Sequence, residues 1–411
     1  MEIGSATAVA GERATGYLDV TDLPTGGTER LPVVVARGET DGPTLWVTGG
    51  VHGNELTGVA VAQDVLAGGV PDGLRGTVVC VPICSPAALR RSVRTSYYHG
   101  DDPNRYFPGD ESPSERASSS IDDRRVQELI GERLYERIVE SADALLDCHT
   151  AQVGSIPFVI RDRVLFDDPA EPETDTKRDP EGTSDQRADQ RGEQRTESES
   201  RSESEARDLA SRLEALAEAT GLPVVTEYPA DEYVDRNLHK SAAGAVLNRA
   251  GIPALTLELG SFSVVEEAHR AAGVAAVYRT MVHLDMLDAV PEEIADATPR
   301  TDPPVDFPVR RFRGPNAPRA AVCRHRLAAG ESFETGDVVA DLVSPHGDVL
   351  ESVAVEYDGY VLGLANTVCY ENDPVASLAV RDDADLVVPR ESDNGLGDAR
   401  GDDGQGDARE R

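Results

Sequence analysis

The sequence predicts an α/β fold: a mixed central sheet flanked by helices, followed by a small C-terminal all-β domain of the barrel-sandwich type. Apolar runs of strand length alternate with segments of helical spacing through the first two thirds of the chain, which is typical of a sheet covered on both faces. Residues 289–306 are rich in Pro, Asp and Thr, and short strands and turns follow them. The 411 residues suffice for one large core and one small core.

The expected strands are short apolar runs bounded by turn residues. Residues 76–83 are one example, because they are apolar almost throughout and too short for a buried helix. The expected strands of the main sheet lie at residues 32–38, 43–48, 76–83, 142–148, 156–161, 223–227 and 252–258.

Segments of helical spacing separate these strands. Val126, Ile130, Leu134 and Ile138 recur about one turn apart and mark one face of a helix. Gly221 ends a later helix, as glycine often does after the last turn. The expected helices lie at about residues 54–66, 122–140, 207–220, 237–250 and 264–288.

Polar segments divide the chain into parts. Residues 166–206 consist largely of Glu, Asp, Arg, Gln, Ser and Thr, and such a segment cannot bury enough apolar surface to fold. We therefore expect a main domain at 1–290 that contains 166–206 as a disordered acidic insertion. A linker at 291–306, a β domain at 307–390 and a disordered acidic tail at 391–411 complete the prediction.

The acidic excess argues against nucleic acid as a partner and indicates a surface adapted to high salt. The formal net charge is -35, and lysine occurs only at Lys177 and Lys240. A nucleic-acid-binding function is disfavoured, because phosphate contacts need a basic face. At molar salt the Debye length falls to about 3 Å and surface carboxylates barely repel one another, so the composition indicates a protein from a halophile.

Cysteine usage and hydropathy favour the cytoplasm. The five cysteines are odd in number and form no C-x-x-C pair, which argues against a disulfide framework and favours a reducing compartment. The first residues do not resemble a signal peptide, and no apolar stretch reaches the roughly 18 residues needed to span a bilayer. We expect a cytoplasmic protein without a membrane partner.

A candidate metal site begins where a strand is expected to give way to a helix. His52 and Glu55 are three residues apart, close to one helical turn, so both side chains can reach one point. His149 follows a later apolar strand at the same predicted edge of the sheet, where α/β proteins bind ligands. Two histidines and one carboxylate leave a fourth position for water, which is typical of catalytic zinc. We expect His52, Glu55 and His149 to bind one Zn²⁺ per chain.

Four stretches of the sequence, in this order, resemble the succinylglutamate desuccinylase/aspartoacylase family, which is related to the zinc carboxypeptidases. They are residues 50–58 (Gly-Val-His-Gly-Asn-Glu-Leu-Thr-Gly), 102–109 (Asp-Pro-Asn-Arg-Tyr-Phe-Pro-Gly), 147–150 (Asp-Cys-His-Thr) and 255–260 (Leu-Thr-Leu-Glu-Leu-Gly). The resemblance implies a zinc carboxypeptidase-like catalytic domain. It also implies a zinc-dependent amidohydrolase that cleaves an N-acyl amino acid or a related small amide bearing a carboxylate.

The resemblance assigns roles to three residues outside the metal set. Glu258 matches the family's general base and proton shuttle, and it ends an expected strand at the same edge of the sheet. Asn104 and Arg105 match the clamp for a substrate carboxylate, for which a guanidinium fork is suited.

The amide hydrolysis that the resemblance implies also requires an arginine that polarises the scissile carbonyl. We assign Arg94 to this role, with Arg90 and Arg91 as alternatives, because residues 90–102 do not align cleanly with the family's pattern. In the implied mechanism, Glu258 deprotonates the water that zinc activates and later returns the proton to the leaving amine.

Asp147 and Cys148 directly precede His149 on the expected strand, and the sequence predicts a different setting for each. Asp147 has no assigned role, although carboxylates often orient metal-bound histidines. Cys148 is expected to be a buried, inert thiol, because side chains alternate along a strand and this one points away from the metal.

Two other functions stay open. A metallocarboxypeptidase acting on short peptides would use the same metal set, although a β domain over the site would exclude long chains. A non-catalytic binding protein could keep the fold, but the intact metal set and Glu258 argue against it. The β domain itself has two interpretations, narrowing of the site or an interface in a homo-oligomer.

Overall fold

A computed structural model describes residues 1–98, 100–108, 125–167, 201–298, 300–365 and 367–390. Most of the expected acidic insertion and the whole of the expected acidic tail lie outside these residues.

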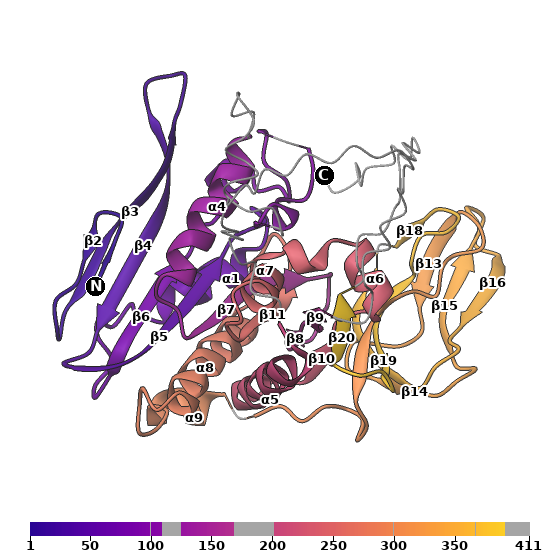
Figure 1. Ribbon diagram of the computed structural model, residues 1–411. Helices are drawn as coiled ribbons and strands as arrows, with labels where there is room; N and C mark the ends of the chain where they lie inside the picture. The colour runs from indigo at the N-terminus through magenta and orange to yellow at the C-terminus, as the bar shows by residue number, and fades with distance from the viewer. Residues whose placement is uncertain (99, 109–124, 168–200, 299, 366, 391–411) are drawn as a thin grey trace, which may run out of the picture.

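A mixed sheet of twelve strands runs through the molecule (Figure 1). At its centre β5, β7 and β11 are parallel neighbours, so their carboxyl ends meet at one edge. In order across the sheet, the strands are β14 (Ser332–Phe333), β17 (Gly359–Leu364), β19 (Ala376–Arg381), β12 (Val309–Arg313), β10 (Val224–Thr226), β8 (Phe158–Arg161), β11 (Ala254–Ser261), β7 (Ala144–Ala151), β5 (Thr40–Gly49), β6 (Arg75–Val81), β4 (Thr28–Arg37) and β3 (Arg13–Asp22).

The central strands are apolar because helices cover them. Leu45, Trp46 and Val47 on β5 are completely buried, as are Leu145 and Leu146 on β7. Helices α1, α5 and α8 pack together in one group, and α4 packs against α7 in another. The helices are α1 (Leu56–Asp64), α2 (Pro86–Leu89), α4 (Val126–Val139), α5 (Glu203–Thr220), α6 (Ala230–Asp235), α7 (Ala242–Asn248), α8 (Glu267–His283) and α9 (Glu292–Ala297), with 3-10 turns η1 (Pro103–Arg105) and η2 (Leu238–Lys240).

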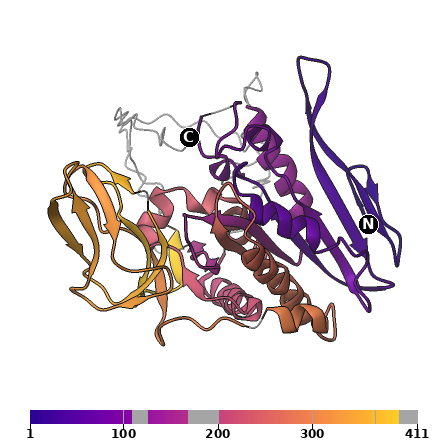
Figure 2. The same ribbon diagram turned by 180° about the vertical axis from the view of Figure 1, so that it is seen from behind.

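The strands after residue 308 form a sandwich (Figure 2). A second sheet contains, in order, β16 (Val349–Ala354), β15 (Val338–Val343), β13 (Ala321–His325) and β18 (Val368–Cys369). Its buried Leu342 and Val353 share a core with Val361 and Leu378 of β17 and β19. The α/β class with an added all-β part is therefore confirmed.

The β sandwich is continuous with the main sheet. Strand β12 pairs in parallel with β10, and β20 (Val387–Arg390) returns to pair with β9 (Val164–Asp167). These pairings place side chains of the C-terminal strands beside the α/β part. The domain division at residues 291–306 stays a prediction.

The structure differs from the expected elements at several boundaries. β9 extends to Asp167 and α5 begins at Glu203, so both ends of the expected insertion are ordered. α5 begins early because Ser202 and Glu205 form a capping box, a strong start signal in the sequence. The expected linker contains α9, and the unpredicted strands β1 (Glu2–Ile3), β2 (Ala6–Thr7) and β3 precede the first expected strand.

Among the described helices, none combines the length and the apolarity that crossing a bilayer requires.

The acidic surface predicts salt-dependent stability. With a net charge of -35, raising KCl from 0.1 M to 2 M should raise the midpoint of thermal unfolding by on the order of 10 °C, because screening weakens the repulsion between carboxylates. Calorimetry in KCl and in sucrose of equal osmolality checks this, since sucrose stabilises without screening. A midpoint that is unchanged in KCl, or that rises equally in sucrose, would contradict salt adaptation.

Candidate metal centre

The candidate metal centre is built at the edge where β5 and β7 end. The loop after Gly49 carries His52, and Glu55 occupies the N-cap position of α1. A side-chain carbon on Gly58 would lie 2.3 Å from the carbonyl oxygen of Cys148, so only glycine lets α1 approach β7 this closely. This close packing brings Glu55 to His149.

The three predicted ligands converge. Nδ1 of His52 lies 2.7 Å from Oε1 of Glu55, and Nδ1 of His149 lies 2.7 Å from Oε2 of the same carboxylate. One candidate ligand atom from each residue lies within 4.8 Å of the other two, and each residue is 3% exposed. This group can hold a metal ion, as the sequence predicted.

The hydrogen bonds of the imidazoles show which nitrogen is available to a metal. Nε2 of His52 contacts Oδ1 of Asp102 at 2.9 Å, and Nε2 of His149 contacts Oδ2 of Asp147 at 2.7 Å. Nδ1 of His52 is buried and has no aligned hydrogen-bond partner among the described residues. Two imidazoles held by carboxylates, with Nδ1 turned toward Glu55, fit a zinc site.

The charges around the centre favour ionised carboxylates. Burial alone would raise the pKa of Glu55, but the charges of His52 and His149 outweigh it and hold that pKa well below its usual range. Burial also raises the pKa of Asp102. Its hydrogen bond to His52 and the charge of Arg94 outweigh this effect and lower that pKa well below its usual range. Both carboxylates therefore suit cationic partners.

Two carboxylates that orient the histidines had no predicted role. Asp147 lies two residues before His149 on β7, so both side chains point to the same face, and the alternation of the strand identifies this contact. Asp102 begins the stretch 102–109 that resembles the family, two residues before Asn104. Its place in that stretch is the sequence feature that could have indicated a role for it. Cys148 is buried as expected, and burial raises the pKa of its thiol.

Glu258 lies next to the candidate metal centre. On β11 it is the register partner of His149 on β7, so the two side chains are neighbours on one face of the sheet. It is 8% exposed, and its Oε2 has no hydrogen-bond partner among the described residues. Burial, the largest effect, raises the pKa of Glu258, which suits a group that takes up and releases a proton.

A cavity of about 650 Å³ opens onto the three ligands and Glu258. It extends over alternate residues of β8 and β11 and reaches the C-terminal strand β12. Several buried polar atoms that have no partner among the described residues belong to side chains lining it, so a polar ligand could satisfy them. These atoms are His52 Nδ1, Asn54 Oδ1, Thr150 Oγ1, Gln152 Oε1, Tyr228 Oη, Glu258 Oε2 and Arg311 Nε.

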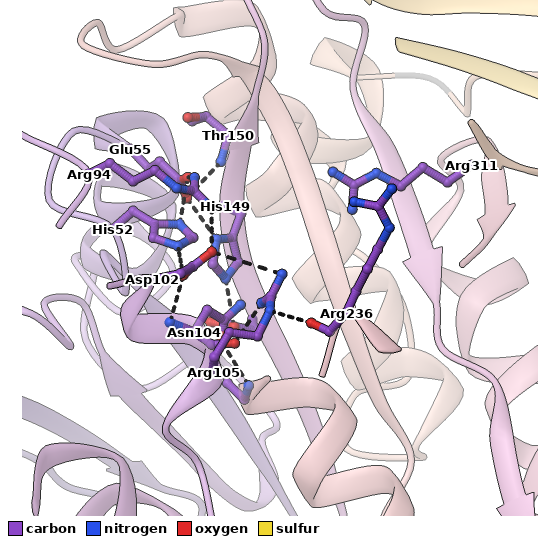
Figure 3. A network of polar contacts seen from close by, with 12 residues as sticks. His52, Glu55, Arg94, Asp102, Asn104, Arg105, His149, Thr150, Arg236 and Arg311 are labelled. Carbon is purple, nitrogen blue, oxygen red and sulfur yellow. Dashed lines mark hydrogen bonds and ion pairs between the residues drawn. The ribbon is translucent and has the colours of Figure 1, made fainter. Parts of the chain in front are cut away.

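The structure separates the three candidate arginines. Arg94 lines the cavity and donates to Oε1 of Glu55 at 3.3 Å and to Oδ2 of Asp102 at 2.9 Å (Figure 3). Arg90 instead forms two hydrogen bonds, of 3.3 and 3.2 Å, with the buried carboxylate of Glu29, and Arg91 is exposed. Only Arg94 among the three is placed to contact a ligand beside the metal centre.

Asn104 and Arg105 also line the cavity, and both are held firmly. Oδ1 of Asn104 accepts from the backbone N–H of Ala242 at 2.8 Å. The guanidinium of Arg105 donates to the backbone oxygens of Arg236 at 3.0 Å and Asn104 at 2.7 Å (Figure 3). These bonds fix the orientation of both side chains at the wall.

Arg311 from β12 reaches the same cavity (Figure 3). Its Nη1 lies 2.9 Å from Oε1 of Glu227, and its guanidinium lies 5.5 Å from the centre of the Tyr228 ring. No motif around Arg311 in the sequence predicts that it lies in the site. β12 follows the expected linker and reaches the site through its pairing with β10. The C-terminal strands therefore supply part of the cavity wall.

Comparison with known proteins agrees with this geometry. Residues 41–163 match the Succinylglutamate desuccinylase/Aspartoacylase catalytic domain. A curated relative, N-alpha-acetyl-L-2,4-diaminobutyric acid deacetylase from Halomonas elongata, is 34% identical over 135 residues. The match covers 32% of this chain and 36% of the relative, about a third of its length.

Two solved structures resemble the chain over most of its length. One is a succinylglutamate desuccinylase/aspartoacylase from Rhodobacter sphaeroides, with a TM-score of 0.64 at 22% identity, covering 91% of this chain and 96% of that one. The other is the product-bound ectoine utilization protein EutE (DoeB) from Ruegeria pomeroyi, with a TM-score of 0.65 at 17% identity, covering 92% and 100%. At these identities the likeness is one of fold. The family match itself is confined to residues 41–163, the part of the chain that carries His52, Glu55 and His149.

Proposed function

We propose that this protein is a zinc-dependent amidohydrolase that removes the acyl group from an N-acyl amino acid or a related small amide bearing a carboxylate. The observation that carries the proposal is the convergence of His52, Glu55 and His149 beside Glu258 in one cavity. The family match and the deacetylase from Halomonas elongata support the reaction class. The five free, buried cysteines support a reducing compartment, and we infer the cytoplasm.

The metal ligands and four other residues of the cavity each have a task in this reaction. A zinc ion bound by one Glu and two His would supply an acidified water and a positive charge for the carbonyl oxygen. Glu258 takes the proton of the attacking water and returns it to the leaving nitrogen. Asn104 and Arg105 orient the substrate carboxylate, and Arg94 donates to the oxygen that gains charge.

Replacing Arg94 by Ala should lower kcat by about 10²–10³-fold, because one donor to the developing oxyanion is lost. The change in KM should be much smaller. The matched control is Arg91→Ala, since Arg91 is a neighbouring arginine that is exposed and does not line the cavity. Steady-state kinetics of both variants check this. Equal losses in the two variants would remove Arg94 from the reaction.

A substrate panel tests the proposed function. Zinc-loaded protein in molar KCl is given N-acetyl and N-succinyl amino acids, and dipeptides and tripeptides with free amino groups. Release of primary amine from the N-acyl amino acids, abolished by a chelator and restored by zinc, is the expected result. Faster cleavage of the peptides would favour a metallocarboxypeptidase. Bound zinc without any turnover would favour a binding protein.

A further inference from the structure

A buried carboxylate binds the segment that carries Arg94. Glu29 lies near the start of β4, and its side chain is completely buried. β4 runs antiparallel to β6, with Val34 opposite Cys80, so the beginning of β4 lies at the edge where β6 ends. β5 is parallel to β6 and ends at the same edge, which is also the edge of the candidate metal centre. Glu29 is therefore placed to support the site from within the protein.

Both ends of the segment 90–98 bind this one carboxylate. Nη1 and Nη2 of Arg90 donate to its two oxygens at 3.3 and 3.2 Å, and the hydroxyl of Tyr98 donates to Oε2 of Glu29. Burial, and then the hydrogen bond to Glu29, raises the pKa of Tyr98, so the phenol stays protonated and remains a donor. Hydrogen bonds to a charged acceptor are stronger than neutral ones, so Glu29 holds both ends of the segment firmly.

The path of the segment between these ends depends on its anchors. Residues 90–98, which the structure describes throughout, form turns rather than a helix or a strand. Ser92 has a φ of +50°, and a residue other than glycine in this left-handed region needs surrounding contacts to hold it there. A loss of the contacts with Glu29 would therefore let the segment move.

Arg94 lies in the middle of this segment. Its guanidinium donates to Glu55 at 3.3 Å and to Asp102 at 2.9 Å, beside the group of converging ligand atoms (Figure 3). A long side chain keeps such a position only when its backbone is fixed, and a displacement of about 1 Å can cost about 100-fold in rate. By binding Arg90, Glu29 also keeps a second guanidinium of the segment away from the carboxylates of the cavity.

We propose that Glu29 is a positioning residue that holds the segment 90–98 in place, so that Arg94 meets the carbonyl oxygen of the substrate. The proposal rests on the proposed amidohydrolase function and adds to that reaction a residue that does not line the cavity. Glu29 contacts no reacting atom, so its effect on turnover is exerted through Arg94. Zinc binding and substrate affinity depend on other residues and are largely independent of it.

Glu29→Gln tests this role. The change keeps the shape of the side chain, removes its charge and places an NH₂ group where Arg90 or Tyr98 needs an acceptor. We expect kcat to fall by about 10–100-fold, while KM changes by less than about threefold and the zinc content is unchanged. In the Arg94→Ala background the same change should lower kcat by less than about twofold, because the group that Glu29 positions is absent.

A second buried ion pair supplies the matched control. Asp382 is 8% exposed, its Oδ2 lies 3.1 Å from Nη2 of Arg163, and neither residue lines the cavity. Any loss that Asp382→Asn causes through stability should multiply with the loss in Arg94→Ala. Losses of Glu29→Gln and Arg94→Ala that multiply in the same way, or an unchanged kcat in Glu29→Gln, would overturn the proposal.

Tyr98→Phe keeps the test decisive if circular dichroism shows that Glu29→Gln does not fold. This change removes one of the two anchors and leaves Glu29 paired with Arg90. We expect kcat to fall by about three- to tenfold in the wild-type background and by less than about twofold in the Arg94→Ala background. A full multiplicative loss in the second background would overturn the proposal.

Hydrogen exchange measures the anchoring without turnover. The backbone amides of residues 90–98 should exchange faster in Glu29→Gln, or in Tyr98→Phe, than in the wild-type protein, because local opening becomes easier. Equal exchange would overturn the proposal. A wild-type protein that hydrolyses none of the amides would refute the proposed reaction, whereas the exchange result would still decide whether Glu29 anchors the segment.

Discussion

Glu258→Gln is expected to leave zinc binding intact and to lower kcat by about 10³-fold or more. General acid–base catalysis contributes about 10²–10⁴-fold, and here one carboxylate would serve both proton transfers. Glutamine keeps the shape of the side chain but cannot accept the proton of water. Because Glu258 lies beside His149 and outside the group of converging ligand atoms, the metal should stay bound.

Metal content by mass spectrometry and single-turnover kinetics measure the two effects separately. Glu267→Gln is the matched control, because Glu267 is an exposed residue on α8 that pairs with Arg270. The control should retain turnover within about twofold of the wild type. If Glu258→Gln retained turnover, another group would have to move the proton.

His149→Ala is expected to abolish both zinc binding and activity. The change leaves His52 and Glu55 as the remaining protein ligands, whereas catalytic zinc sites use three. Zinc per chain should fall from about one to less than roughly a tenth after dialysis, and turnover should fall with it. Asp147 loses its imidazole partner at the same time, so circular dichroism must show that the variant is folded.

The matched control for this variant is His283→Ala, since His283 is an exposed histidine at the end of α8. It should keep its zinc and its activity. An unchanged zinc stoichiometry in His149→Ala would refute the proposed ligand set.

The sequence predicted the parts of the site that rest on local patterns. The three-residue spacing of His52 and Glu55 fixes their approach within one turn, and the end of an apolar strand places His149 at the same edge. The alternation along β7 turns Cys148 away from His149 and places Asp147 on the same side as His149. The contact between Asp147 and His149 therefore follows from the sequence, although the prediction assigns Asp147 no role.

Contacts between distant segments could not be predicted in this way. The choice among Arg90, Arg91 and Arg94 depends on Glu29, a buried residue of β4 that pairs with Arg90 and leaves Arg94 to the cavity. Arg311 enters the site because β12 pairs with β10, a long-range parallel pairing that no hydrophobic pattern specifies. Such pairings depend on the packing of the whole sheet.

Anomalous diffraction at the zinc absorption edge, from crystals of active protein, tests the metal centre most directly. We predict a single strong anomalous peak about 2.0–2.2 Å from Nδ1 of His52, Nδ1 of His149 and a carboxylate oxygen of Glu55. Active crystals with no anomalous peak among these three side chains, or with zinc bound elsewhere, would contradict the account.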